Sequence, residues 1–366
     1  MSDGQHYAPT APTARAAGPV CEPGEFDFAV MHMDHGHIFG MAANLAAVGA
    51  RCTHVFEPDE RRVAALRKQH PDVKAVADPR EILENPDIRL VAAAAIPDLR
   101  GPLGVEVMRH GKDYFTDKTP FTGLDQLETA RAVAAQTGRK YAVCYSERLQ
   151  NEAAEHAAQL VRDGVIGEVV QVLGLGPHRL SKDRRPAWFF EKARYGGILC
   201  DIGSHQAEQF LTYTGATDAE ITMARVENFA NPDTPELEDF GEFSLRGDSV
   251  CGNKGAAGYF RMDWFTPDGL RTWGDGRTTI LGTKGFIECR KYVDLAREPL
   301  NENSVYVVDE HGEEHHDVTG RVGFPFFGAF VRDCLERTEQ AMSQAHAFRA
   351  AELCLRAQAI ADGARG

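Results

Sequence analysis

A run between residues 195 and 215, YGGILCDIGSHQAEQFLTYTG, contains the residue types that general acid–base chemistry needs. Asp201, His205 and Glu208 are spaced i, i+4 and i+7, which would place them on one face of a helix. A histidine near a helix start feels the positive end of the helix dipole, which disfavours its protonated form. A neutral histidine beside a carboxylate can act as a general base, although ordinary surface pairs share this spacing. We interpret His205 as a candidate base and Asp201 as the group that orients it.

A second candidate is Lys118, in FTDKTPF, directly after a short apolar run. If that run is a strand of a parallel sheet, Lys118 stands at its carboxyl end, where ligands of such sheets bind. A lysine there can contact a substrate hydroxyl and stabilise developing alkoxide charge. A solvated lysine at a strand end is the alternative interpretation.

Glu147, in CYSERL, and His178, in GLGPHRL, follow two further apolar runs. With Asp201 and His205 they would supply two histidines and two carboxylates, a donor set that suits a divalent metal. Their separations match no recognised short metal motif, so we favour a polar pocket without a metal, in which Glu147 and His178 contact substrate. The Trp- and Arg-containing segment 261–277 suits either a sugar face or packing of a sheet.

The elements that must position these side chains follow from the hydrophobic pattern. Between residues 26 and 146, short apolar runs alternate with segments of helical periodicity. This pattern predicts parallel strands joined by right-handed helical crossovers, which is a doubly wound α/β domain. Strands covered on both faces are expected to be apolar without alternation, as these runs are.

The pattern changes after residue 147, where longer runs alternate polar and apolar residues. Such runs predict a large, mostly antiparallel open sheet. A helix is expected at 153–163 and another at about 199–213, and two more, from about 325 and from 345 to 362, close the chain. The expected strands are 167–176, 220–230, 239–247, 256–265, 277–290 and 304–310.

The chain is therefore expected to be an α/β protein with two domains. A Rossmann-type domain would span 25–147, and an α+β domain for substrate binding and oligomerisation would span 148–366, with a last helix that can pack back on the first domain. Residues 1–24, rich in Ala, Pro, Thr and Gly, are expected to form a disordered tail.

The first strand and helix enclose the turn HMDHGHIFG, where a dinucleotide-binding turn has G-x-G-x-x-G. The three glycine positions are occupied by His32, Asp34 and His37. His32 fits if the turn needs no positive φ, and Asp34 is expected to point away and cap the helix. Because backbone amides and the helix dipole do not depend on side chains, we expect residues 35–38 to bind pyrophosphate. The candidate cofactor contacts of this turn are His32, Asp34, His35, Gly36, His37 and Ile38.

Glu57 follows the second expected strand, roughly 20 residues beyond the turn, where a Rossmann domain has an acid that binds the adenosine ribose. A carboxylate there repels a 2′-phosphate, so the expected cofactor is NAD, with NADP disfavoured. Pro97, at the end of the apolar run 90–97, and Lys118 complete the expected cofactor contacts.

Composition limits the partners. The formal net charge of −14 argues against nucleic acid, which needs a basic face. No apolar run approaches the ~18 residues of a membrane span. The eight cysteines include no C-x-x-C pair, which suits reduced thiols in a cytoplasm.

Together these motifs resemble those of the Gfo/Idh/MocA family of sugar and cyclitol oxidoreductases, over about residues 26–362. In that family the Rossmann domain ends in E-K-P, and the second domain opens with a helix bearing G-G-G-x-x-x-D-x-G-x-H-x-x-D. The chain has DKTP at 117–120, GGILCDIGSHQAE at 196–208 and a strand turn, GTKG, at 282–285. Asp117 replaces the family's glutamate, Glu208 replaces its last aspartate, and Thr119 displaces its Lys-Pro peptide, which is often cis.

The resemblance implies roles for single residues. The family's substrate-contacting lysine falls on Lys118, its orienting aspartate on Asp201, its catalytic histidine on His205 and its ribose-binding acid on Glu57. The implied activity is NAD-dependent hydride transfer between nicotinamide and a secondary alcohol or ketone of a sugar, cyclitol or related polyol, by a homodimer or homotetramer. Two alternatives remain: an enzyme that retains its NAD through a transient oxidation, and a non-catalytic binding or regulatory protein on the same scaffold.

Overall fold

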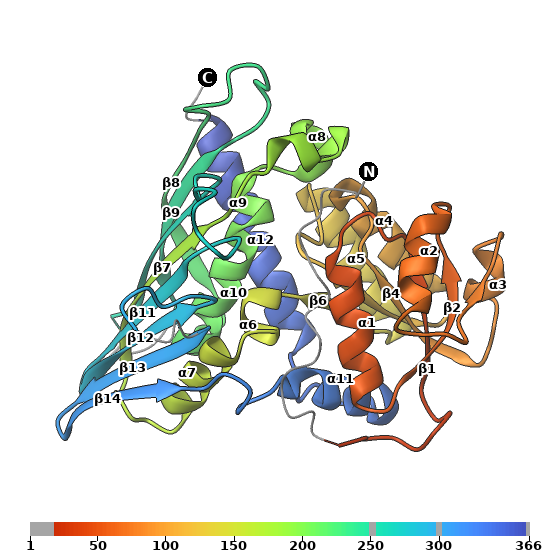
Figure 1. The fold of residues 1–366 in the computed structure, drawn as a ribbon, viewed down its shortest axis with the longest axis horizontal. Helices are drawn as coiled ribbons and strands as arrows, with labels where there is room; N and C mark the ends of the chain where they lie inside the picture. Colours follow the sequence, from red (N-terminus) through yellow and green to blue (C-terminus); the bar gives the residue numbers. More distant parts are fainter. Residues whose placement is uncertain (1–17, 249–253, 298–301, 364–366) are drawn as a thin grey trace. The chain divides into compact units, whose positions relative to one another are not determined.

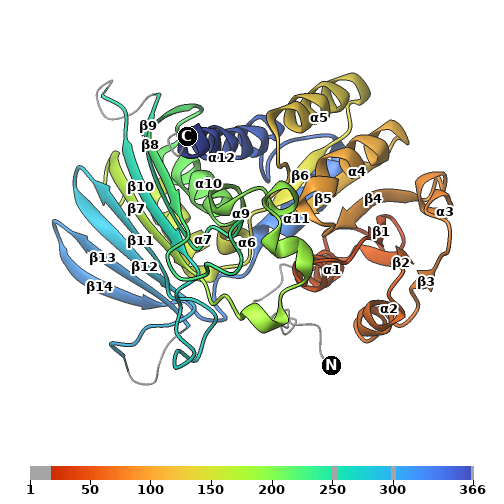
Figure 2. The same ribbon diagram turned by 90° about the horizontal axis from the view of Figure 1, so that it is seen from above.

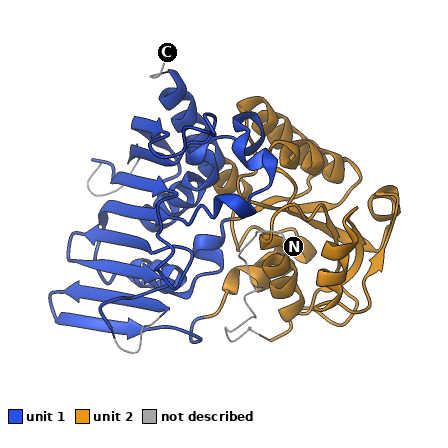
Figure 3. Ribbon diagram, turned by 45° about the horizontal axis from the view of Figure 1, so that its top comes forward, with its two compact units in different colours: residues 1–4, 145–322, 349–366 blue, residues 5–144, 323–348 orange. Residues whose placement is uncertain are grey.

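The computed structural model describes residues 18–248, 254–297 and 302–363. Among these, residues 18–144 and 323–348 form one compact unit, here called the N-terminal unit, and residues 145–322 and 349–363 form the C-terminal unit (Figure 3). The division differs from the expected one, because the first unit ends at residue 144 and includes the segment 323–348.

The N-terminal unit contains a parallel sheet of six strands in the order β3-β2-β1-β4-β5-β6 (Figure 1). The central strands β1 and β5 are buried at every residue, as unalternated apolar runs require. The predicted doubly wound domain is thereby confirmed. Its elements are β1 (Asp27–Met31), α1 (His37–Ala47), β2 (Arg51–Phe56), α2 (Glu60–Arg67), β3 (Lys74–Ala75), α3 (Arg80–Leu83), β4 (Ile88–Ala93), α4 (Pro97–Arg109), β5 (Asp113–Asp117), α5 (Leu124–Thr137), β6 (Tyr141–Cys144) and α11 (Pro325–Glu336).

Consecutive residues of β5 pack on opposite sides of this sheet and fix its carboxyl end. Tyr114 packs against Tyr141 and faces Gly104 of α4, where a Cβ atom would lie 2.6 Å from the Tyr114 ring. Phe115 packs instead on Phe330 of α11, with ring centroids 5.1 Å apart. Helix α11 therefore completes the core of the N-terminal unit, although it lies about 200 residues further along the chain than β5.

Part of the expected tail is ordered. The Val20 amide donates to the Val48 carbonyl oxygen at 2.8 Å, which ties the segment to the end of α1. Residues 18–24 of the expected tail belong to the described residues, and residues 1–17 lie outside them.

The C-terminal unit contains an eight-stranded sheet in the order β14-β13-β12-β11-β7-β10-β9-β8, in which β7 and β10 pair in parallel and the other neighbours antiparallel. This confirms the predicted large, mostly antiparallel sheet. Its strands are β7 (Val169–Pro177), β8 (Ala219–Glu227), β9 (Phe240–Gly247), β10 (Ala257–Asp263), β11 (Gly276–Gly282), β12 (Gly285–Lys291), β13 (Asn303–Asp309) and β14 (Gly312–Asp317). Its helices are α6 (Ser146–Leu149), α7 (Glu152–Arg162), η1 (Lys182–Arg184), η2 (Ala187–Phe190), α8 (Lys192–Tyr195), α9 (Ile198–Asp201), α10 (Gly203–Thr214) and most of α12 (Gln344–Gly363).

Helices cover one face of this sheet (Figure 2). Helix α10 approaches closely because glycines face it: a Cβ atom on Gly258 would lie 2.8 Å from Phe210, and one on Gly174 would lie 2.6 Å from Gln206 Oε1. In the part that the structure describes, no helix of this unit lies on the other face (Figure 2). That face exposes large apolar side chains, namely Val170, Leu173, Leu281 and Phe286.

Two expected elements are divided. The helix expected at 199–213 is interrupted at Ile202, so that Asp201 ends α9 and His205 lies in the first turn of α10. The strand run expected at 277–290 is a hairpin, β11–β12, because Thr283 and Lys284 form the turn that resembled the family's GTKG. Strand β14 was not predicted. None of the described helices is long and apolar enough to cross a membrane.

Candidate active site

The turn between β1 and α1 keeps a sharp bend although none of the three motif positions is a glycine. His32 has φ +55°, so the position does require a positive φ, and the condition under which His32 was expected to fit is not met. Its amide donates to Phe56 O at 3.1 Å and its carbonyl accepts from the Ala94 amide at 3.0 Å. The His35 amide was expected to bind pyrophosphate. It donates instead to Ala94 O at 3.0 Å, so it is not directed at a ligand.

Asp34 was expected to cap helix α1, but it does not. The N-cap residue is Gly36, and no side chain makes a capping hydrogen bond there. The Asp34 carboxylate instead accepts from Arg62 Nη1 at 3.0 Å. The same guanidinium lies 3.5 Å from Glu57 Oε1. Arg62 therefore compensates the negative charge that Asp34 brings to the turn.

Glu57 ties β2 to the turn. Its Oε2 accepts from the Met33 amide at 2.7 Å, and its Oε1 accepts from the Asp59 amide at 2.9 Å. Each carboxylate oxygen carries two lone pairs, so each can accept one further hydrogen bond, such as one from a ribose hydroxyl.

Asp117, the last residue of β5, holds two histidines of the turn. The carboxylate accepts from His37 Nδ1 at 2.7 Å, and His35 Nδ1 lies 2.8 Å from its other oxygen. Two further donors reach the Asp117 carboxylate. Arg100 Nη2 donates to it at 3.2 Å, and the Lys118 backbone amide donates to it at 2.8 Å. Burial raises the pKa of Asp117, but His37, Arg100 and His35 outweigh it and hold that pKa well below its usual range.

His35 is neutral near neutral pH. Burial and the neighbouring His37 lower the pKa of His35 to about 3, against the opposing effect of Asp117. Lys118 follows this cluster, 5 % exposed, and its peptide bond to Thr119 is cis. The cis bond therefore directly follows the lysine although the residue after it is not proline. Pro97, expected at a strand end, is instead the first residue of α4.

His35, His37 and Asp117 also place three metal-type donor atoms within 4.8 Å of one another. Each Nδ1 atom already lies at hydrogen-bonding distance from the carboxylate, and the Arg100 guanidinium contacts the same group. This arrangement suits a carboxylate that orients two imidazoles. A nearby guanidinium opposes the binding of a cation.

In the C-terminal unit, Glu147 is the centre of a buried polar cluster. It lies in the short helix α6, one residue beyond its start, and its Oε2 accepts from Lys291 Nζ at 2.9 Å and from Gln206 Nε2 at 3.1 Å. Although burial raises the pKa of Glu147, Lys291, His205 and His178 outweigh it and hold the pKa below its usual range. The structure thus brings Glu147, His178 and His205 together.

His178 lies just beyond β7, and its Nε2 is 3.7 Å from Glu147 Oε1. Trp264 and Trp273 pack on its imidazole, with ring centroids 5.4 and 4.4 Å away. Both tryptophans of the segment 261–277 therefore pack on His178, a candidate substrate contact. This placement is compatible with a role at a sugar face and with packing of the sheet.

His205 is 1 % exposed, and its backbone amide donates to Ile202 O at 3.2 Å. Asp201 precedes the break at Ile202 and is half-buried. Glu208, expected on the same helical face, is fully buried and accepts from Arg148 Nε at 2.8 Å. Glu208 is thus a structural partner of Arg148.

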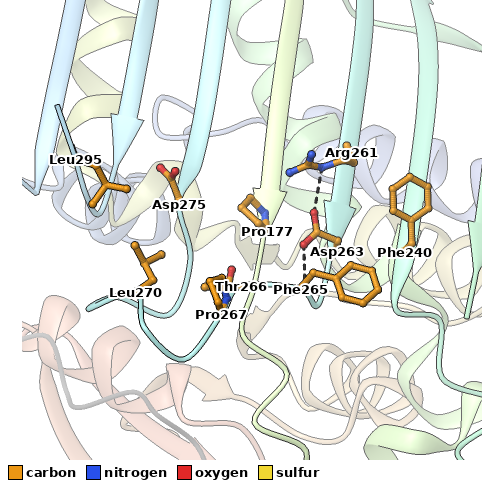
Figure 4. A pocket seen from close by; sticks show the side chains of 10 residues that line it. All are labelled: Pro177, Phe240, Arg261, Asp263, Phe265, Thr266, Pro267, Leu270, Asp275 and Leu295. Carbon is orange, nitrogen blue, oxygen red and sulfur yellow. Dashed lines mark hydrogen bonds and ion pairs between the residues drawn. The ribbon is translucent and has the colours of Figure 1, made fainter. Parts of the chain in front are cut away.

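A separate cavity of about 440 Å³ lies at one end of the sheet, between the strands and the loop that follows β10 (Figure 4). Asp263 faces it and pairs with Arg261 Nε at 3.0 Å. Burial raises the pKa of Asp263. Several residues of the segment 261–277 line this cavity, but the candidate catalytic and substrate-binding side chains do not; these are Lys118, Glu147, His178, Asp201 and His205.

Three buried residues of these clusters were missed by sequence reasoning: Lys291, Gln206 and Arg100. A signal for Lys291 did exist, because strand alternation places it on the same face as Ile287 and Cys289, which are buried. Arg100 looks like an ordinary polar residue of a helix start, and only the fold shows that its Nε atom donates to Ala95 O at 2.6 Å.

Comparison with known proteins agrees with this fold and these motifs. Residues 33–145 match the model described as "Oxidoreductase family, NAD-binding Rossmann fold", and residues 154–288 match the "GFO/IDH/MocA C-terminal domain". A crystal structure described as an oxidoreductase from Erwinia carotovora atroseptica is 47% identical with a TM-score of 0.87, over 92% of this chain and 98% of that one. The chain belongs to the GFO/IDH/MocA family of NAD-binding oxidoreductases, as its motifs indicated.

More distant relatives have named activities. The scyllo-inositol 2-dehydrogenase (NAD(+)) of Bacillus subtilis is 24% identical over 240 residues, which are 65% of this chain and 66% of that protein. The chain therefore spans slightly less than two thirds of that relative. A levoglucosan dehydrogenase in complex with NADH and levoglucosan shares the fold, with a TM-score of 0.72 and 16% identity over 93% of this chain and 98% of the other.

Proposed function

We propose that this protein is an NAD-dependent dehydrogenase or ketone reductase that acts on a secondary alcohol or ketone of a sugar, cyclitol or related polyol. The observation that carries the proposal is the placement of His205 in the first turn of α10, beside the charged, buried pair of Glu147 and Lys291. Relatives named as dehydrogenases of scyllo-inositol and levoglucosan support this substrate class.

Each residue has a proposed part in the reaction. NAD, when bound, supplies the hydride acceptor. His205 takes the hydroxyl proton, and Asp201 orients His205. Lys118, at the carboxyl end of β5, stabilises the charge that develops on the substrate oxygen. Glu147 and His178 contact other groups of the substrate.

The proposed NAD contacts are in the N-terminal unit. Gly36 and the residues that follow it form the amino-terminal end of α1, where backbone amides and the helix dipole favour a diphosphate. Glu57 has unused lone pairs for ribose hydroxyls. The buried carboxylate also disfavours a 2′-phosphate, so we propose NAD over NADP. The remaining proposed contacts of the cofactor are His32, Asp34, His35, His37, Ile38, Pro97 and Lys118.

Calorimetric titration with NAD, followed by NADH formation with a panel of polyols, tests the proposal. His205→Asn should keep NAD affinity and lower turnover by ~10²–10⁴-fold, the usual effect of losing a general base. His311→Asn, on an exposed hairpin, is the matched control. Near-normal turnover of His205→Asn would remove this residue from the mechanism.

The altered glycine turn favours a second candidate, a binding or regulatory protein without catalysis. Failure to bind NAD at millimolar concentrations, with no nucleotide released from denatured protein, would support it. NAD that is released on denaturation, without net NADH formation, would instead indicate an enzyme that retains its cofactor.

We also propose a homodimer or homotetramer, because the outer face of the eight-stranded sheet exposes Val170, Leu173, Leu281 and Phe286. Light scattering coupled to gel filtration measures this directly. The seven described cysteines are free, which supports the proposed cytoplasmic location.

A further inference from the structure

A histidine pair in the C-terminal unit links helix α7 to β14, the edge strand of the eight-stranded sheet (Figure 1). His156 Nε2 and His316 Nδ1 are 2.8 Å apart, and the ring centroids are 5.1 Å apart at an interplanar angle of 61°. Both side chains are half-buried, so water and small ions can reach the pair. Neither histidine belongs to the proposed active site, and the pair therefore needs an explanation of its own.

The tautomer of His316 follows from its other ring nitrogen. Nε2 lies 2.8 Å from Glu314 Oε2, and a carboxylate oxygen can only accept a hydrogen bond, so Nε2 carries the hydrogen. The lone pair of the neutral ring is then on Nδ1, the atom that faces His156. A carboxylate that orients an imidazole in this way is the usual outer contact of a histidine that binds a metal.

The His156 ring can direct a second lone pair at the same point. In the pair as it stands, His156 Nε2 carries the hydrogen and donates it to His316 Nδ1. Burial and the neighbouring His316 lower the pKa of His156, so its ring is neutral at neutral pH. When an ion binds Nε2, the hydrogen is exchanged through solvent to Nδ1 of the same ring, so the ring stays neutral and no net proton is released.

We propose that His156 Nε2 and His316 Nδ1 bind a divalent transition-metal ion, with water as its remaining ligands, and that Glu314 orients His316 in this site. Two nitrogens that lie about 2.0 Å from one ion and at a right angle to each other are about 2.8 Å apart, whereas a tetrahedral ion separates them by about 3.3 Å. The observed separation of 2.8 Å matches the right angle. The site therefore favours Cu²⁺ or Ni²⁺, which prefer tetragonal geometry, over Zn²⁺.

The surroundings of the pair favour a cation. Among the described residues, no lysine or arginine pairs with Glu314. Asp163, seven residues after His156 on α7, raises the pKa of His156 against the effect of burial, so its negative charge favours a positive charge there. His315 points to the other face of β14, where its Nε2 lies 3.1 Å from Ser304 Oγ. No third donor of a metal type joins the pair within 4.8 Å in the described residues, so water completes the coordination.

Titration of the untagged, full-length protein with CuSO₄ tests the site, because Cu²⁺ binds nitrogen ligands most tightly among the first-row divalent ions. The number of bound ions should fall by one in His156→Asn and in His316→Asn. His311→Asn, in the exposed turn between β13 and β14, is the matched control and should keep the full number. Unchanged stoichiometry in both variants of the pair would overturn the proposal.

The role of Glu314 has its own variant. Glu314→Ala should keep the bound ion and weaken its affinity by about 10-fold, which is the lower end of the effect of such outer contacts. We expect the lower end because the Glu314 side chain is 72% exposed and water can replace it in part. An unchanged affinity for Cu²⁺ would show that Glu314 does not orient His316.

A second measurement uses the unaltered protein, so it does not depend on how well a variant folds. In ¹⁵N spectra of histidine-labelled protein above neutral pH, His316 should show a hydrogen on Nε2 and none on Nδ1. Cu²⁺ below one equivalent, which is paramagnetic, should broaden the signals of His156 and His316 before that of His311. A hydrogen on Nδ1 of His316, or equal broadening of all three residues, would show that the pair is only hydrogen-bonded and would rule the metal site out.

Discussion

Replacing Lys291 with methionine removes the cation that balances the buried Glu147 carboxylate. The side chains of Lys291 and Glu147 are 0% and 3% exposed and 2.9 Å apart, so solvent screens their attraction little. Removal of one partner from such a buried pair costs about 3–5 kcal/mol, because the remaining charge stays uncompensated. At about 2–4 °C per kcal/mol for a unit of this size, the melting temperature should fall by roughly 6–20 °C.

The stability lost in Lys291→Met should depend on pH, and the ion pair of Lys291 with Glu147 determines the sign of that dependence. In the unaltered protein, burial raises the pKa of Glu147 but Lys291, with His205 and His178, holds it below its usual range. Such a carboxyl stabilises the fold above its unfolded pKa, and this contribution is lost as pH falls through the folded pKa. Without Lys291, burial dominates and raises that pKa, so the stability of the variant should decrease as pH rises from about 5 to about 8.

Calorimetric melting of four proteins measures the effect: the unaltered chain, Lys291→Met, Glu147→Gln and the double variant. The double variant should regain most of the loss because no charge remains buried there. Lys284→Met, in the exposed β11–β12 turn, is the control. A Lys291→Met protein within about 0.5 kcal/mol of the unaltered chain at neutral pH would refute the reasoning.

Other residues give further predictions. NADP should bind at least ~10-fold more weakly than NAD, about 1.4 kcal/mol by calorimetry, and equal affinities would show that Glu57 does not contact the ribose. Lys118→Ala should raise KM and lower kcat in steady-state assays, and unchanged kinetics would exclude its role at the substrate oxygen. Because burial and His37 lower the pKa of His35 to about 3, the unfolded chain binds a proton there that the folded chain does not. Stability should therefore fall by about 2 kcal/mol from pH 6.5 to 5, and His35→Asn should remove that slope in denaturant titrations.

The fold was predictable where hydrophobic patterns are strong. The unalternated apolar runs of β1 and β5 identified a parallel sheet, and alternation in β9 and β10 identified the antiparallel one. The break at Ile202 left no such signal, because the residues on both sides of it are helical. The position of α11 could not be predicted either, since it depends on Phe115 meeting a helix from the far end of the chain.

The sequence predicted which residues belong to the candidate site better than it predicted which residues they contact. Motif spacing pointed to Asp201 and His205, and strand ends pointed to Glu147 and His178. The partners that set their chemistry come from distant positions: Lys291 is 144 residues from Glu147. Such contacts are tertiary, and no local pattern encodes them.

The turn at 32–37 lacks the three glycines of the G-x-G-x-x-G motif but still connects β1 to α1 by a sharp bend. At the first glycine position, His32 adopts the left-handed backbone that histidine tolerates better than most residues, and Phe56 and Ala94 bond its backbone on both sides. At the second, the charge of Asp34 is taken up by Arg62.

At the third position, His37 is held by Asp117, a residue of another strand. Each lost glycine thus has a compensating partner that the glycine motif does not include. The Arg62 guanidinium is shared between Asp34 and Glu57, so it is poorly placed to attract a 2′-phosphate as well. The substitutions therefore alter the side chains around the helix start and leave its positive potential in place, and their presence alone is weak evidence against dinucleotide binding.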